Sequence, residues 1–226
     1  MSLISGVALG SSQSNSGSWT GITVPAGTKL AVLGVDGYIA VTAYFTSPDA
    51  MPTLGSLSMT CPDTGHVQDQ TTYHMGGTFY LINPTVGSGQ TLAWDWAGAA
   101  DLSQSDLCVF YLAFFDDVVT GVRASSGNQL ISTSHSTGAI AAQSGDLVVA
   151  CASLWGSLLS ITWTNATEIS TQHSYDSNVS LAYAYASGSI TISAESANTD
   201  GGIFGVAFIP SAGATLIPRM GLLGVG

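Results

Sequence analysis

Short apolar runs and alternating polar and apolar stretches recur along the whole chain, separated by turns rich in Gly, Ser, Asn, Asp and Pro. Two of the runs, 108–115 and 147–152, are apolar throughout. Such runs are typical of β-strands, whereas the i, i+3, i+4 spacing of an amphipathic helix is never sustained. The pattern therefore predicts an all-β chain of antiparallel strands.

Five of these blocks occur twice in the same order, which predicts a diverged tandem repeat. The matching blocks are 27–35 with 144–152, 57–61 with 159–163, 79–84 with 181–186, 90–96 with 189–194 after one residue of slip, and 108–115 with 203–209. Several short strands in each half are typical of a β-sandwich of the jelly-roll or immunoglobulin-like kind. We therefore expect two tandem antiparallel β-sandwich domains related by internal duplication, 1–117 and 118–213, which pack together because the linker after Asp117 is short.

The last stretch, residues 214–226, belongs to neither repeat. Pro210 and Pro218 resist continuation of a regular strand, so we expect an extended C-terminal arm. The arm is apolar with one charge, which predicts that it docks on a neighbouring subunit. Its predicted interface residues are Leu216, Ile217, Arg219, Met220, Leu222 and Leu223. The alternative is that it folds back over an exposed edge strand of its own second sandwich.

Composition and charge remove several classes of protein. Of the 226 residues 46% are hydrophobic and 8% charged, with only 2 Glu and 1 Lys, which excludes a disordered tail or a helical bundle. The net charge of -11 leaves no basic patch for nucleic acid or anionic lipid. The amino terminus has neither the charge nor the apolar length of a signal peptide or membrane span. Sparse cysteines, predicted as buried free thiols at Cys108 and Cys151, agree with a reducing cytoplasm.

Residue combinations that carry catalysis are missing from the sequence. The four histidines form no metal-binding motif, and no serine lies in a nucleophile elbow. We therefore expect no enzyme activity and assign no catalytic, cofactor-binding or metal-binding residue. His66 and His173 occupy corresponding polar loops, either with a shared role or as ordinary surface residues. The Asp-Gly pairs 36–37 and 200–201 are predicted as turns and not as calcium loops.

The tryptophans suggest one candidate ligand site. Trp94 and Trp96 lie at i and i+2 and so share one face of a predicted strand. An exposed aromatic row of this kind stacks on sugar rings. The alternative is that the pair fills the sandwich core, because Leu92 precedes Trp94 in the same alternation.

The second half contains a Gly turn and strand at 145–149, Ser/Thr alternation at 159–163, a Tyr/Ala strand at 181–186, a Gly-Ser turn with alternation at 188–194, and a closing strand at 205–210. This order resembles the tandem β-sandwich proteins of tailed-bacteriophage structural modules. The resemblance implies a non-enzymatic virion protein assembled in the host cytoplasm, such as a capsid decoration (cement) protein that stabilises the head lattice. A tail, fibre or carbohydrate-binding receptor module is the alternative. It also implies a homo-oligomer, with a trimer expected, that contacts the major capsid protein or other virion proteins.

Overall fold

In the computed structural model the described residues are 2–12, 14, 16–38, 51–62, 66–69, 74–95, 108–129, 133–156, 160–174, 177–197 and 201–211. All the secondary-structure elements among these residues are β-strands, and all the paired strands are antiparallel. The prediction of an all-β, antiparallel chain is therefore confirmed. The predicted arm at 214–226, with all its interface residues, and Trp96 lie outside the described residues.

The first half of the chain forms two sheets. The inner sheet has the order β1-β9-β3-β7-β6 and the outer sheet the order β2-β8-β4-β5. Their strands are β1 (Leu3–Ser12), β2 (Ser16–Val24), β3 (Leu30–Tyr38), β4 (Thr53–Leu54), β5 (Leu57–Ser58), β6 (His66–Asp69), β7 (His74–Ile82), β8 (Gly87–Asp95) and β9 (Cys108–Phe115).

The second half repeats this arrangement, with an inner sheet β10-β17-β12-β15-β14 and an outer sheet β11-β16-β13. Its strands are β10 (Val119–Gln129), β11 (Ser134–Ser136), β12 (Leu147–Trp155), β13 (Thr162–Thr164), β14 (Thr167–Ser174), β15 (Ser177–Tyr185), β16 (Ser193–Glu195) and β17 (Gly201–Pro210).

Matching strands occupy the same place in both halves. The strands of each half can be numbered one to eight in chain order, with β4 and β5 counted together as strand four. The inner sheet then has the order 1-8-3-6-5 in both halves, and the outer sheet begins with the order 2-7-4. Strands that cross in turn between two sheets in this way are typical of a jelly roll. The shared order is what the predicted repeat requires, and origin by duplication stays a prediction.

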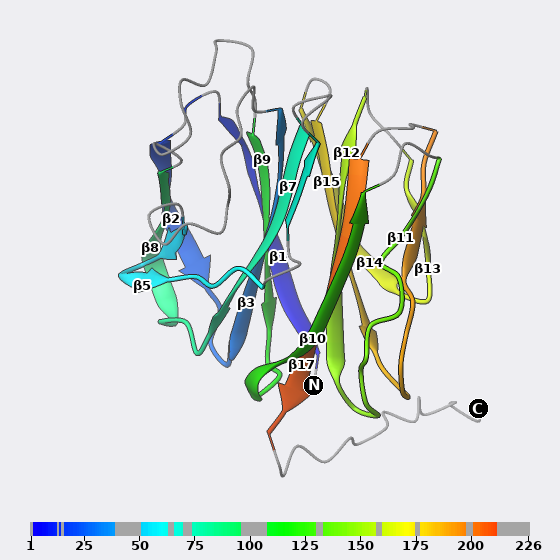
Figure 1. The fold of residues 1–226 in the computed structure, drawn as a ribbon. Coiled ribbons are helices and arrows are strands. Elements are labelled where there is room, and N and C mark those ends of the chain that lie inside the picture. Colours follow the sequence, from blue (N-terminus) through cyan, green and yellow to red (C-terminus); the bar gives the residue numbers. More distant parts are fainter. Residues whose placement is uncertain are drawn as a thin grey trace, which may run out of the picture.

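The four sheets stack as four layers (Figure 1). The outer sheet with β2 and β8 lies at the left, the one with β11 and β13 at the right, and the two inner sheets lie between them. One apolar core fills the space within each sandwich. A third core, which includes Val32, Phe115, Val149 and Phe204, joins the two inner sheets. The two sandwiches therefore form one packed body.

This stacking explains the apolar runs of the sequence. All of β9 is buried, as are the first eight residues of both β12 and β17. A strand covered on both faces needs apolar side chains at every position, whereas a strand with one exposed face alternates. In the outer sheet β8 shows that alternation, with Leu92 and Trp94 buried between more exposed residues.

Three local predictions are corrected by the structure. His66 and His173 lie in β6 and β14 and not in polar loops. These two strands are edges of the inner sheets, and polar residues are common at edges. The pair Asp36–Gly37 lies inside β3 and forms no turn, because Asp36 is buried against the second sandwich.

The close approach of the two inner sheets gives a first prediction. Gly76 on β7 faces Ser153 on β12, and a Cβ atom placed on Gly76 would overlap with the side chain of Ser153. We expect Gly76→Ala to lower the free energy of unfolding in urea by about 1–3 kcal/mol, because the sheets must move apart. Adding Ser153→Gly should recover part of the loss.

Gly121→Ala is the matched control for this substitution. A Cβ atom there meets nothing within 4 Å, so we expect a change within about 0.5 kcal/mol. If Gly76→Ala were as mild as Gly121→Ala, the inner sheets would not pack at this distance.

Candidate functional site

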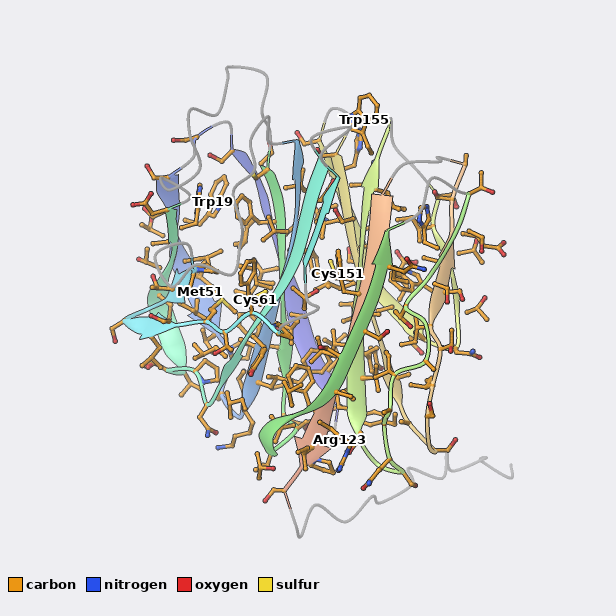
Figure 2. The ribbon with its side chains drawn as sticks, in the orientation of Figure 1. Trp19, Met51, Cys61, Arg123, Cys151 and Trp155 are labelled. Carbon is orange, nitrogen blue, oxygen red and sulfur yellow. The ribbon has the colours of Figure 1, made fainter. Side chains whose placement is uncertain are left out.

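A group of polar side chains lies buried between the two sandwiches. The Ser153 hydroxyl donates a hydrogen bond to Asp36 Oδ1, and both residues are inaccessible to solvent. The Asn178 side chain donates to the carbonyl oxygens of Leu154 and Gly156 at 3.1 and 2.7 Å, which ties the end of β12 to β15. Cys151 lies nearby in the middle of the molecule (Figure 2).

The chemistry of this group is structural. Burial raises the pKa of Asp36 well above its usual value, although Ser153 and the backbone N–H groups of Gly37 and Asn178 lower it. Burial also raises the pKa of the Cys151 thiol, and the nearby Asp36 adds to this rise. A thiol held protonated and away from solvent is a poor nucleophile and metal ligand. The group therefore links the two halves and offers no reactive atom to a substrate.

The buried carboxyl group predicts an unusual pH dependence. We expect the free energy of unfolding to fall as the pH rises above about 4, because the unfolded chain ionises Asp36 there while the folded protein keeps it protonated. Burial raises the pKa of Asp117 to about 6, which adds a decrease of the same sign between about pH 4 and 6. Asp36→Asn should become more stable than the unaltered protein as the pH rises, by about 1.4 kcal/mol per unit of pKa difference.

Asp117→Asn distinguishes the contribution of Asp117 to the pH dependence of unfolding from that of Asp36. Asp117 accepts a hydrogen bond from the Tyr185 hydroxyl at 3.1 Å, and the variant should flatten the pH profile only between about pH 4 and 6. An Asp36→Asn profile parallel to that of the unaltered protein would show that Asp36 has the same pKa in the folded and unfolded states.

A hollow of about 460 Å³ marks the outer face of the second sandwich. Among the residues that line it, Glu195 on β16 lies opposite both Ser134 on β11 and Thr162 on β13. The next row of the same face repeats the pattern with Ser136, Ser193 and Thr164. Because Ala194 between the rows is buried, the rows face outward. This hydroxyl face combines groups that both donate and accept hydrogen bonds with one carboxylate.

The outer face of the first sandwich has a related arrangement. Asp95 lies opposite Ser16, and Ser18 and Thr53 both lie opposite Ala93. Each end of the four-layer body thus exposes short side chains with an acidic residue beside a serine. The signal in the sequence is the Ser/Thr alternation, but only the pairing of strands shows which hydroxyl groups share a face.

A second hollow, of about 480 Å³, lies at the seam between the sandwiches. Segment 60–62 and Tyr80 line it from the first half, and residues 122–125 of β10 line it from the second. Arg123 does not supply a free cation there, because its Nε and Nη2 donate to Asp146 at 2.5 and 3.2 Å. Asp146 is fully buried and also accepts from the Gln143 N–H at 2.8 Å. The ion pair therefore anchors the turn before β12.

The remaining sequence candidates do not come together into a site. His173 Nδ1 lies 3.0 Å from Asn178 Oδ1, and His135 is buried on β11 of the outer sheet of the second half. In the described part of the chain no three His, Cys, Asp or Glu side chains are placed to hold a metal ion. No helix among the described residues is long and apolar enough to cross a bilayer.

The structure excludes Trp94 from the predicted sugar-stacking pair. Trp94 is only 5% exposed and packs against Phe110, with ring centroids 4.8 Å apart, and against Trp19. Its indole N–H donates to the Ser14 carbonyl oxygen at 3.2 Å. A ring in this position fills the core and leaves no face for a sugar. Among the described residues, Trp155 at the end of β12 is more exposed than Trp94, and it lies near the top of the molecule in Figure 2.

Comparison with known proteins does not assign the chain to a family. No protein-family model matches the chain, and neither the curated proteins nor the solved structures give a match.

Proposed function

We propose that the chain is a non-enzymatic structural protein of a tailed-phage virion, a capsid decoration protein that stabilises the head lattice. The observation that carries this proposal is the outer hydroxyl face of the second sandwich, with its counterpart on the first. Ser, Thr and Ala lose little side-chain entropy when they are ordered against another surface, unlike Lys, Arg and Glu. Such faces on a body packed through three cores suit a rigid building block.

Charge supports a protein partner for these faces. With a net charge of -11, and with Arg123 engaged by Asp146, Glu195 and Asp95 lie on exposed positions of an acidic molecule. Complementary potentials guide such a surface to a basic patch on the partner. In this proposal the partner is the major capsid protein or another virion protein, and the chain occupies the particle as a homo-oligomer, with a trimer expected.

Locating the chain in purified particles tests the proposal. The chain should sediment with the heads in a fixed ratio to the major capsid protein, and electron cryo-microscopy should place the four-layer body on the lattice. Density at a tail tip or fibre would instead support the tail alternative. A chain that stays in the supernatant when particles sediment would overturn the virion proposal.

The hydroxyl face can be tested by a charge reversal. We expect Glu195→Lys to weaken binding to heads that lack the protein by at least about tenfold, because a like charge then faces the basic partner. Glu168→Lys is the matched control, since Glu168 is also exposed but lies on β14 in an inner sheet. Equal binding of the two variants, with unfolding unchanged, would exclude this face from the contact.

Trp155 favours a second candidate, a carbohydrate-binding module. Its side chain is 36% exposed at the end of a rigid inner strand, where an indole ring can stack on a sugar. Binding of a glycan that Trp155→Ala abolishes and Leu57→Ala retains would support this candidate, because Leu57 is also exposed but not aromatic.

A further inference from the structure

The two inner sheets face each other with their strand orders reversed. At one seam β1 contacts β14, and at the other β6 contacts β10. In the order of strands across the inner sheets, β1 and β10 are first, β3 and β12 third, and β6 and β14 fifth. The first strand of each inner sheet therefore contacts the fifth strand of the other, and the two third strands contact each other in the middle.

Residues can be matched between the halves through the strand pairing alone. In β3, Leu30 lies opposite both Ile82 and Phe115. In β12, Leu147 lies opposite both Tyr185 and Phe208. Leu30 therefore corresponds to Leu147, and the same register continues along all three central strands of each inner sheet.

The aromatic contacts across the interface come in a reciprocal pair. Tyr80 of β7 packs edge-on against Phe208 of β17, with ring centroids 5.3 Å apart and planes at 75°. The corresponding residues are Tyr183 of β15 and Phe115 of β9. They also pack edge-on, at 5.9 Å and 70°.

A second reciprocal pair lies closer to the centre. A Cβ atom placed on Gly34 would lie 2.9 Å from the end of Leu181. The residues that correspond to these two are Cys151 and Thr78, and Cys151 lies against Thr78. When residue i contacts j and the counterpart of i contacts the counterpart of j, the interface is isologous, as in a two-fold symmetric dimer.

Corresponding residues meet each other on the central strands. Asp36 and Ser153 correspond, and they form the buried hydrogen bond. Gly34 and Cys151 correspond, and a Cβ atom placed on Gly34 would lie 3.1 Å from Cys151 Sγ. Contact between a residue and its own counterpart occurs only on a two-fold axis, which here runs between β3 and β12 along the strands.

We infer that the chain is a tethered pseudo-dimer: the inner face of each sandwich is a docking surface for the inner face of the other half, and the axial residues specify this pairing of unlike halves. In a true dimer the residues on the axis must be identical. Here they differ in a complementary way. Pairing of two first halves would bring Asp36 against a second Asp36, and pairing of two second halves would bring two Cys151 side chains together at the place where glycine now leaves room.

Exchange of the axial residues in the full chain tests this inference. Asp36→Ser with Ser153→Asp swaps the pair across the axis and keeps the same two side chains in contact. We expect the midpoint of thermal unfolding to stay within about 2 °C of the unaltered protein. Ser153→Asp alone places two carboxyl groups in contact and should lower the midpoint by about 6 °C or more at neutral pH.

A second exchange, Gly34→Cys with Cys151→Gly, applies the same test without charge. It should unfold at a higher temperature than either single variant, because the single variants put two thiols or two glycines on the axis. An Asp/Ser exchange no more stable than Ser153→Asp, together with a Gly/Cys exchange no more stable than its single variants, would show that the axial positions are not equivalent. That result would overturn the inference.

Discussion

Phe204→Ala is expected to lower the free energy of unfolding by about 3–5 kcal/mol, as for a large side chain in the middle of a single core. Phe204 lies on β17, is fully buried, and belongs to the core between the two inner sheets. Interfaces between independent domains are more polar and looser, and truncation there is milder. The expected loss therefore measures whether the two sandwiches are packed as one body, and urea unfolding monitored by tryptophan fluorescence gives it.

Phe110→Ala is the matched control for Phe204→Ala. Phe110 is also fully buried but belongs to the core within the first sandwich, where it contacts Trp94. We expect the two losses to agree within about 1–2 kcal/mol, the spread that local relaxation produces at fixed chemistry, and both variants to unfold in one transition. A loss below about 1 kcal/mol for Phe204→Ala alone, with two separate transitions, would mean that the sandwiches are merely docked.

Arg123→Ala should destabilise the protein by a similar amount, about 3–5 kcal/mol, because it leaves the carboxylate of Asp146 buried without its cation. Arg123 donates two hydrogen bonds to Asp146, whose side chain is fully buried and also holds the Gln143 N–H. Arg123→Lys should lose less than the alanine variant, since lysine keeps the charge but not the two-pronged geometry. Chemical unfolding at pH 7 measures both.

Lys29→Ala is the control for the loss of one positive charge. Lys29 is exposed, so its truncation should change stability by no more than about 0.5 kcal/mol. Arg123→Ala combined with Asp146→Asn should recover part of the loss by removing the unpaired charge. An Arg123→Ala variant as stable as Lys29→Ala would show that the ion pair contributes nothing to the fold.

The sequence predicted the strands that are buried on both faces, because their apolar runs are continuous. It also placed Cys108 and Cys151 in the core, where the structure has them. It missed β1 and most of β10. Both are edge strands with register shifts in their pairing, and their Gly and Ser residues resemble turns.

The order of the predicted repeat blocks agrees with the strand order that the two halves share, but the blocks were matched with an error in register. The block 79–84 was matched to 181–186, which pairs Phe79 with Leu181. Strand pairing instead makes Ile82 the counterpart of Tyr185, and so matches Phe79 with Ala182. A slip of one residue in a strand exchanges its two faces, and a diverged sequence buried on both faces does not reveal which face is which.

The candidate surfaces could not be predicted from the sequence, because they depend on contacts between strands that are distant along the chain. Asp36 looks like a turn residue beside Gly37, and only the opposing sheet with Ser153 explains a carboxyl group inside a strand. Glu195 acquires its hydroxyl neighbours Thr162 and Ser134 through pairing with residues that are 33 and 61 positions away in sequence, a distance no local pattern spans.

The central claim, that the two sandwiches pack face to face with β3 against β12, is tested most directly by Gly34→Cys. A Cβ atom at position 34 would lie 3.1 Å from Cys151 Sγ, close to the separation that a disulfide requires between one sulfur and the Cβ atom of the other residue. After mild oxidation of the folded protein, peptide mass spectrometry should find position 34 linked to Cys151, and Cys151→Ser should abolish the link. A folded, oxidised variant with no such link, or with position 34 joined to Cys61 or Cys108 instead, would contradict the face-to-face arrangement.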